Sequence, residues 1–125
     1  MSVTYHEEYN GKVAVVSVSG RLSKEDYHVF VPKLEQAINR FGTIRILFEM
    51  QDFHGWQADA LWEDIRFDAK HFLHIERLAM VGERKWEKGM SVFCRPFTRA
   101  KIKYFDLAEA AKAHDWIAEG IEVPV

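Results

Sequence analysis

The sequence predicts an α/β fold, in which a largely parallel sheet is built from strands that alternate with helices. Three observations support this prediction. The turn signal Asn10-Gly11 lies between two strand-like segments, and the rest of the chain alternates apolar strands with amphipathic helices. The chain also has no linker and no internal repeat. Strands that alternate with helices run parallel through right-handed crossovers, whereas the initial hairpin adds one antiparallel strand at or near an edge. The predicted order is ββαβαβαβα, in a single domain over residues 1–125.

The first two strands are predicted over residues 3–8 and 12–19, on either side of this turn. The second segment is rich in valine, whose branched side chain favours an extended backbone. It is therefore expected to be a well-buried strand.

The first helix is predicted from Ser23 to Gly42. Ser23 with Asp26 three residues later is a variant of the capping box, and Gly42 is a common helix stop. Pro32 falls inside this helix, where it removes a backbone donor and clashes one turn back. A kink is therefore expected near His28.

The middle of the chain predicts two further strands, each followed by a helix. Residues 43–50 and 77–82 are apolar enough for buried strands. Residues 57–73 form the clearest helix, because their apolar side chains fall on one face at about 100° per residue. A shorter helix is predicted over residues 85–94, and Arg95-Pro96 ends it.

The C-terminal part predicts one more strand and one more helix. Residues 101–105 alternate charged with apolar side chains, which is typical of a strand. Asp106 with Glu109 three residues later forms a capping box, and the helix that follows is expected to run to Ala118.

Composition excludes several classes of protein. Hydrophobic residues make up 48% and charged residues 29% of the 125 residues, as in a globular domain. The apolar runs are too short for a transmembrane helix, and the N-terminus lacks the basic start and apolar core of a secretory signal. The net charge of −2 argues against a polyanion partner, and the single cysteine is consistent with a reducing cytoplasm. We therefore expect a cytoplasmic protein that binds no nucleic acid.

The charge is unevenly distributed along the chain. Residues 84–103 contain one acidic residue, Glu87, and the basic residues Arg84, Lys85, Lys88, Arg95, Arg99, Lys101 and Lys103. Such segregation indicates either a surface for a partner or membrane, or a solvated helix face next to a strand edge protected by lysines. Both interpretations stay open from the sequence.

Signals of enzymatic chemistry are few. The glycines are scattered, so no phosphate-binding loop is present. His71 and His74, with Glu76 nearby, fall where helix should give way to strand, so no metal site is predicted. Arg95 could lower the pKa of Cys94, but a lone cysteine is more often a packed residue. We predict no enzymatic activity and no cofactor.

The middle of the chain holds more large apolar side chains than two helices need for one core face each. Trp56 and Phe67 fall on the side opposite the apolar face of their helix. Another helix or a second copy of the chain would cover them in one interpretation. In the other, they belong to an apolar groove for a small ligand or to a patch that meets a membrane or protein.

Short motifs spread over nearly the whole chain carry a resemblance to a known family. They are, in order, Asp26-Tyr27 with Pro32, Phe53-His54-Gly55-Trp56 leading to Trp62 and Asp64, Lys85-Trp86, Pro96-Phe97-Thr98-Arg99-Ala100 before Tyr104-Phe105-Asp106, and Ala113 with Trp116-Ile117. With the ββαβαβαβα order, they resemble the SpoIIAA-like family, the bacterial single-domain relatives of STAS and CRAL-TRIO domains.

This resemblance implies a mixed five-stranded, STAS/CRAL-TRIO-like sheet and a role without catalysis. Hydrophobic-ligand binding with membrane association and regulation of a protein partner are the two roles it suggests. Anti-sigma-factor antagonists of the STAS group carry a phosphorylatable Ser at the start of the helix after the third strand. Here that place reads Met50-Gln51-Asp52-Phe53-His54-Gly55-Trp56-Gln57, and no Ser or Thr occurs between residues 44 and 90. A phosphorylation switch there is therefore not expected.

Taken together, these features predict a binding module that holds a small apolar or amphipathic, lipid-like ligand between the helices at residues 57–73 and 85–94. The expected ligand-binding residues are Trp62, Phe72, Trp86, Met90 and Phe93. The alternative is a STAS-type protein-interaction module that acts without the phosphorylatable Ser.

A surface for a membrane or partner is expected beside this site. Its residues are Trp56, Phe67, Arg84, Lys85 and Lys88. Basic residues interleaved with rings suit an anionic lipid surface, which predicts reversible peripheral association. A twofold dimer that covers Trp56 and Phe67 is the other expectation for this surface.

Overall fold

The computed structural model describes residues 2–56, 73–86, 89–91, 94–95, 97 and 99–121. The side chains of Ser2, Lys24 and Trp56 are not among the described parts. The helix predicted over residues 57–73 lies outside the described residues except for Leu73, which is in a turn.

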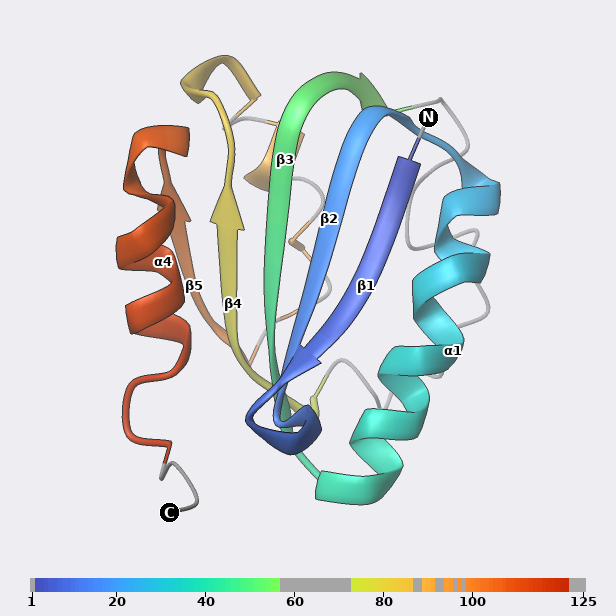
Figure 1. Cartoon of the computed structure of the whole chain (residues 1–125), viewed down its shortest axis with the longest axis vertical. Helices are drawn as coiled ribbons and strands as arrows, with labels where there is room; N and C mark the ends of the chain where they lie inside the picture. Colours follow the sequence, from blue (N-terminus) through green and yellow to red (C-terminus); the bar gives the residue numbers. More distant parts are fainter. Residues whose placement is uncertain are drawn as a thin grey trace.

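Five strands form one mixed sheet in the order β1-β2-β3-β4-β5 (Figure 1). They are β1 (Ser2–Glu8), β2 (Val13–Leu22), β3 (Ile44–Trp56), β4 (Ile75–Val81) and β5 (Lys101–Phe105). β1 pairs antiparallel with β2, and the other neighbours pair parallel. The predicted mixed α/β sheet, with its one antiparallel strand at an edge, is confirmed.

Helices cover both faces of this sheet. Figure 1 shows α1 (Lys24–Phe41) on one side and α4 (Ala110–Ile117) on the other. Side chains of successive strand residues point to opposite faces, so Val16 and Phe48 pack under α1 whereas Val15 and Leu47 pack under α4. The sheet therefore separates two apolar cores, the α1-side core and the α4-side core.

The local signals at the hairpin and at α1 work as predicted. A 3₁₀ turn over Tyr9–Gly11 joins β1 to β2, and Asn10 there has a φ of 60°. The Ser23 backbone N–H donates to Asp26 Oδ2 at 2.7 Å, and at the other end the Gly42 N–H donates to the Ile38 carbonyl at 2.7 Å. The helix passes through Pro32 as one element, and the kink near His28 stays a prediction.

The strands β2 and β3 are longer than the predicted segments 12–19 and 43–50. Their extensions pair with each other: Gly20 lies opposite Phe53 and Leu22 opposite Trp56, beyond an irregularity in the register. Asp52 accommodates this with a φ of 53°. A pairing between residues so far apart in the chain is invisible to local propensity, which explains why both predicted ends were wrong.

The helix predicted over residues 85–94 has a different beginning and end. The structure has a 3₁₀ turn, η3 (Arg84–Trp86), helical residues at 89–91 and a turn at Cys94. The final helix follows the prediction more closely, with a 3₁₀ turn η4 (Leu107–Glu109) capped by Asp106 before α4.

Two arginines of the sheet hold the C-terminal end of α4. Arg45 is 8% exposed, and its Nη1 donates to the carbonyls of Ile117 at 3.0 Å and Glu119 at 2.6 Å. Arg77 Nη1 donates to the Trp116 carbonyl at 2.8 Å. The last carbonyls of a helix lack partners within the regular helical pattern, so the two guanidinium groups supply hydrogen-bond donors to this end of α4.

Glu76 completes the network around Arg45. Its Oε1 lies 3.4 Å from Arg45 Nε, and its Oε2 lies 3.1 Å from Lys12 Nζ. Burial by itself would raise the pKa of Glu76, but the hydrogen bonds and charges of Lys12 and Arg45 outweigh it and hold that pKa below its usual value.

Replacing Arg45→Met should lower the free energy of unfolding by about 2–3 kcal/mol, because the α4 carbonyls lose charged donors in a buried position. Urea denaturation followed by circular dichroism measures this loss. The matched control is Arg40→Met on α1, whose side chain is 56% exposed, and its loss should stay within about 0.5 kcal/mol. Equal losses in the two variants would contradict the role of Arg45.

Candidate functional site

The candidate site lies at the carboxyl ends of β4 and β5. Val81 and Phe105 are register partners there, and the Gly82 N–H donates to the Phe105 carbonyl at 3.0 Å. Beyond this bond, the segments that follow the two strands lead to opposite faces of the sheet. After β4 the chain enters the α1-side core, where Met90 and Cys94 are buried, whereas after β5 it turns into α4 on the other face.

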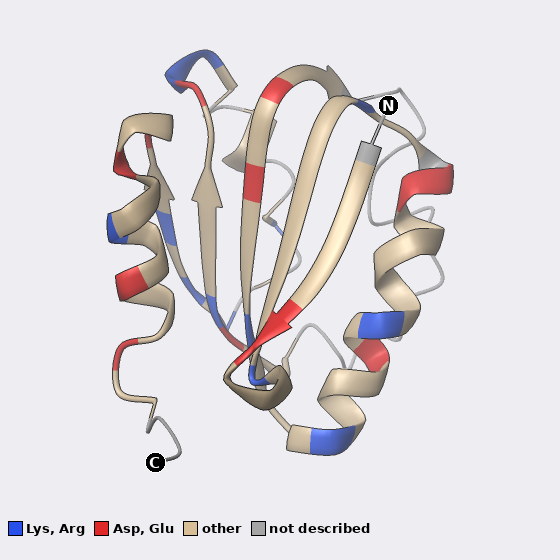
Figure 2. Cartoon of the chain, viewed as in Figure 1, with Lys and Arg blue, Asp and Glu red and all other residues tan. Residues whose placement is uncertain are grey.

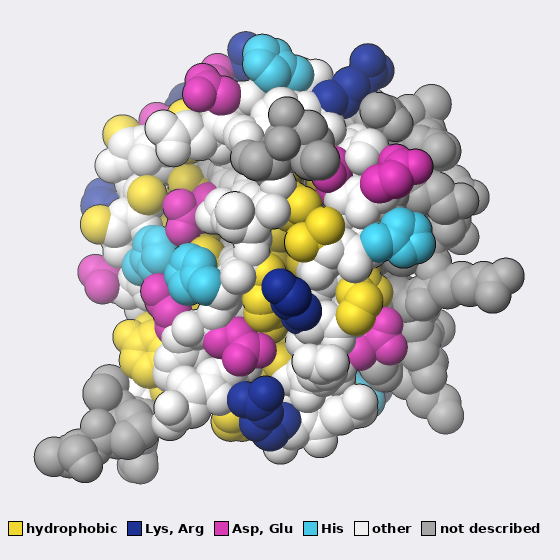
Figure 3. Space-filling model, turned by 45° about the vertical axis from the view of Figure 1, so that its right-hand side comes forward, with side chains coloured by type: hydrophobic (Ala, Val, Ile, Leu, Met, Phe, Trp, Pro, Cys, Tyr) yellow, Lys and Arg dark blue, Asp and Glu magenta, His cyan; other side chains and the backbone are white. Residues whose placement is uncertain are grey.

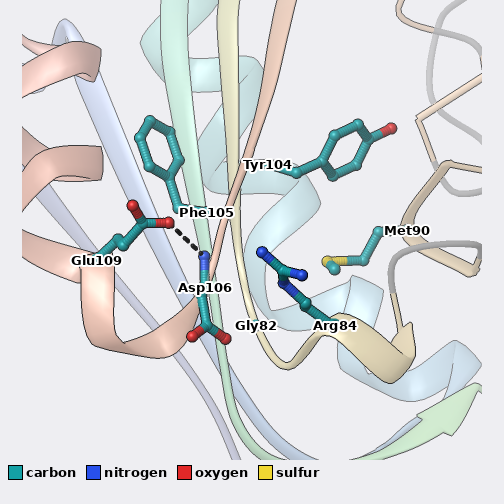
Figure 4. Close-up of a pocket in the computed structure, with 7 residues that line it drawn as sticks. All are labelled: Gly82, Arg84, Met90, Tyr104, Phe105, Asp106 and Glu109. Carbon is teal, nitrogen blue, oxygen red and sulfur yellow. Dashed lines mark hydrogen bonds between the residues drawn. The ribbon is translucent and has the colours of Figure 1, made fainter.

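Such a divergence opens a crevice beyond the strand ends, which is where ligands bind in open α/β sheets. A hollow of about 340 Å³ occupies this position (Figure 4). Its described lining consists of Gly82, Arg84, Met90, Tyr104, Phe105, Asp106 and Glu109. Ligand pockets begin at about 300 Å³, so the hollow is large enough for a small molecule.

One wall of the hollow is apolar and firmly held. Met90 is 2% exposed, and a methyl group added at Gly82 would lie 3.6 Å from its sulfur, at ordinary contact distance. Tyr104 packs half-buried against the α1-side core and hydrogen-bonds the side chain of Cys94. These side chains provide a surface that would bury the apolar part of a ligand.

The other walls carry charge. Arg84 projects from η3, whereas Asp106 and Glu109 come from the turn between β5 and α4 (Figure 4). Glu109 Oε1 accepts from the Asp106 backbone N–H at 3.3 Å, and Glu109 Oε2 pairs with Lys112 at 3.5 Å. The hollow thus combines an apolar wall with separated basic and acidic groups.

A second, smaller hollow of about 140 Å³ lies on the face that carries α4. Its lining is Thr4, Ser17, Val18, Ser19, Glu49 and Gln51. Glu49 Oε1 there lies 2.9 Å from His114 Nε2 of α4. Its volume is below the range of small-molecule sites, so the hollow at β4 and β5 is the better candidate.

Of the residues predicted to bind the ligand, Met90 lines the hollow. Trp86 is partly buried and packs against the α1-side core instead. Its ring lies edge-on to Phe53, with centroids 5.3 Å apart, and 3.3 Å from where a methyl group on Gly55 would sit. The other three predicted residues, Trp62, Phe72 and Phe93, lie outside the described residues.

The predicted membrane or partner surface is described only in part. Arg84 and Lys85 are exposed, as expected. Phe67 and Lys88 lie outside the described residues, as does the side chain of Trp56, so the dimer stays a prediction.

Sequence reasoning missed the tyrosine and the two carboxylates of the hollow. From the sequence, Tyr104, Asp106 and Glu109 are predicted on a strand and at a helix cap, and Tyr104 and Asp106 belong to a family motif, but none of them is predicted at a binding site. The signal that could have found them is their place at the carboxyl end of a parallel strand.

Large exposed apolar side chains are scattered over the described surface. Val29 is 40%, Phe41 36% and Leu73 47% exposed, whereas the apolar atoms between β1 and α1 form only a narrow band (Figure 3). Lys33 Nζ lies 5.5 Å from the centre of the Tyr5 ring in that region. The described residues on the face seen in Figure 3 therefore form no broad apolar patch.

Two further features are absent from the described part of the chain. It contains no group of three or more potential metal ligands, and His71 lies outside it. No helix among its residues is long and apolar enough to cross a bilayer.

Comparisons with known proteins give a family and a fold. A family model described as SpoIIAA-like matches residues 13–118. An uncharacterised protein of the DUF3478 family from Shewanella loihica PV-4, whose crystal structure has a SpoIIAA-like fold, superposes with a TM-score of 0.69. The superposition covers 93% of this chain and 92% of that chain at 24% identity, so it shows the fold alone. No curated protein matches the chain.

Cys94, behind the tyrosine wall of the hollow, is a packed residue. It is 3% exposed, and this burial raises the pKa of the thiol to about 12, although the hydrogen bond with Tyr104 partly opposes the shift. Of the two interpretations of Cys94, the packed one is confirmed by its burial, and Arg95 beside it is exposed to solvent.

The thiolate is the reactive form of cysteine, so Cys94 in the folded protein should react at pH 8 at least about a hundredfold more slowly than in urea. The absorbance of thionitrobenzoate released from dithiobis(nitrobenzoate) measures both rates. The unfolded chain serves as the internal control. A native rate close to that of the unfolded chain would show that the thiol is accessible.

Proposed function

The chain belongs to the SpoIIAA-like family, and on this premise we propose that it is a non-enzymatic binding module for a small amphipathic ligand. One observation carries this function: the hollow beyond β4 and β5, where an apolar wall meets separated charges. A ligand with an apolar body and a polar end fits that division.

Energetic considerations support ligand binding at this place. Apolar area removed from water contributes about 25 cal/mol per Å², so contact with Met90 and Tyr104 would supply most of the affinity. A charged group at the rim, such as Arg84, then orients the polar end and discriminates between ligands. Met90 belongs both to this hollow and to the predicted ligand-binding residues, which links the two descriptions of the site.

The described lining residues also support ligand binding without catalysis. Glu109 is engaged by a backbone N–H and by Lys112, and Asp106 begins the turn before α4. Both carboxylates therefore have structural roles in capping that turn. Among the described lining residues there is no histidine, serine or cysteine that could act as a base or nucleophile.

Peripheral membrane association is a second proposal, carried by the exposed basic side chains around the same strands. Figure 2 shows Lys and Arg on η3 and β5. The exposed ones in this region are Arg84, Lys85, Arg95, Arg99, Lys101 and Lys103. Each cation near an anionic lipid surface contributes about 1 kcal/mol, so several would give weak, salt-sensitive binding.

The ring of Trp86 would take little part in that association. It packs inward against Phe53 and Gly55 rather than outward. Attraction between charges, and not insertion of this ring, would therefore hold the protein at the lipid surface.

Replacing Tyr104→Ala should weaken binding of the uncharged fluorescent probe N-phenylnaphthylamine about tenfold, because the hollow loses an aromatic wall worth about 1–2 kcal/mol. Tyr104→Phe should retain most of the affinity, since it keeps the ring. A fluorescence titration measures both. The matched control is Tyr5→Ala on β1, which also removes a half-buried ring from the α1-side core but lies away from the hollow.

Absence of probe binding, of fatty-acid binding and of any small molecule in native mass spectra of the purified protein would refute the ligand-binding function. A protein that co-purifies in place of a small molecule would favour the alternative, an interaction module without a phosphorylatable Ser. Loss of probe binding in Tyr5→Ala equal to that in Tyr104→Ala would assign the effect to stability.

In vesicle co-sedimentation, the protein should bind phosphatidylglycerol vesicles but not phosphatidylcholine vesicles, and it should dissociate as salt is raised. The double substitution Arg99→Glu/Lys101→Glu should abolish binding. The control Lys33→Glu/Arg40→Glu makes the same change in net charge on α1 and should leave binding nearly intact. Equal binding to both lipids, or equal loss in both variants, would exclude a specific basic surface.

A further inference from the structure

We propose that the ligand of the hollow beyond β4 and β5 is a zwitterion, with an ammonium group and an anionic group at one end and an apolar group at the other. This inference rests on the proposed ligand-binding function and specifies the chemistry of its ligand. Its basis is the way the two signs of charge are arranged around the hollow.

Arg84 supplies the positive side. In Figure 4 its side chain extends from η3 toward the end of β5, next to Met90. The adjacent Lys85 and Glu83 pair with each other at 3.4 Å and so compensate one another. Arg84 forms no ion pair with any residue that the structure describes, which leaves its guanidinium available to an anionic group.

Asp106 supplies the negative side. Its neighbour Glu109 already pairs with Lys112 at 3.5 Å and accepts the Asp106 backbone N–H. The Asp106 carboxylate has no such cation among the described residues, although the residue lines the same hollow. It is therefore the group that an ammonium ion would meet there.

Arg84 and Asp106 do not form an ion pair with each other, even though they follow neighbouring strands and face one hollow. A ligand with a single charge would be attracted by one of these groups and repelled by the other. A ligand that carries both charges is attracted by both when its dipole is oriented correctly. The same arrangement disfavours simple anions and simple cations, which gives selectivity as well as affinity.

The rest of the ligand follows from the wall between these charges. Met90 and Tyr104 provide apolar contact and carry no further charge. An apolar α-amino acid has the required combination, and so does the ammonium-phosphate head of a zwitterionic lipid with its first acyl carbons. The shared chemistry is an ammonium group beside an anion, joined to an apolar group.

Three ligands with the same ring test this chemistry: L-phenylalanine, phenylpropionate without the ammonium group, and phenylethylamine without the carboxylate. Phenylalanine should bind at least about fivefold more tightly than either analogue. Chemical-shift titration of the labelled protein measures all three affinities. Dihexanoylphosphatidylethanolamine below its micelle concentration tests whether the zwitterion is a lipid head instead.

Two substitutions assign the charges. Arg84→Gln should abolish the preference for phenylalanine over phenylethylamine, and Asp106→Asn should abolish the preference over phenylpropionate. Asn is as good a helix N-cap as Asp, so the second variant keeps the turn before α4. The control Lys85→Gln removes a neighbouring cation that does not line the hollow, and it should preserve both preferences.

Binding of the lipid with the same dependence on Arg84 and Asp106 would support the zwitterion and identify a lipid head as its source. An analogue that binds as tightly as phenylalanine, or preferences unchanged by both substitutions, would overturn it. If N-phenylnaphthylamine binds while neither phenylalanine nor the lipid does, the zwitterion is excluded and the ligand-binding function stands. If the probe fails as well, both are excluded.

Discussion

The parallel strands β2, β3 and β4 are buried on both faces, and each face therefore needs its own covering layer. α1 and the segment after β4 cover one face, so the chain must cross to the other after β5. α4 makes that crossing, and its final carbonyls meet the guanidinium groups of Arg45 and Arg77. Those two donors hold the helix end, while Ala113 and Ile117 bury its apolar side against the sheet. The second layer is thus held by hydrogen bonds at one end of α4 and by apolar contact along it.

The hollow beyond β4 and β5 is a consequence of this crossing. Two neighbouring strands end side by side, and their connections leave toward opposite faces. Among the described residues, the Gly82–Phe105 bond is the last backbone pairing between these two strand ends, and side chains line the space beyond it. A fold that buries both faces of its sheet in this order creates a crevice at that edge whatever residues line it. What the crevice can bind is then a property of the side chains placed at its rim.

Membership of the family accounts for the fold of this chain but not for the side chains that line the crevice. The SpoIIAA-like match and the structural likeness to the Shewanella loihica protein account for the sheet, its order and its covering helices. They leave open which groups surround the crevice, because a fold hosts many functions. In this chain the rim is dipolar, with Arg84 on one side and Asp106 on the other. The proposed ligand follows from those side chains and not from the likeness.

The sequence by itself determined the features that neighbouring residues produce. The Asn10-Gly11 turn and the Ser23–Asp26 cap arise from contacts within a few residues, so local signals predict them. The true ends of β2 and β3 required pairing between distant segments. Arg84 and Asp106 likewise reach one hollow only because β4 and β5 pair and then diverge. Neighbouring residues determine local conformational preferences. A site formed by two strand ends, in contrast, exists only once the tertiary structure brings those ends together.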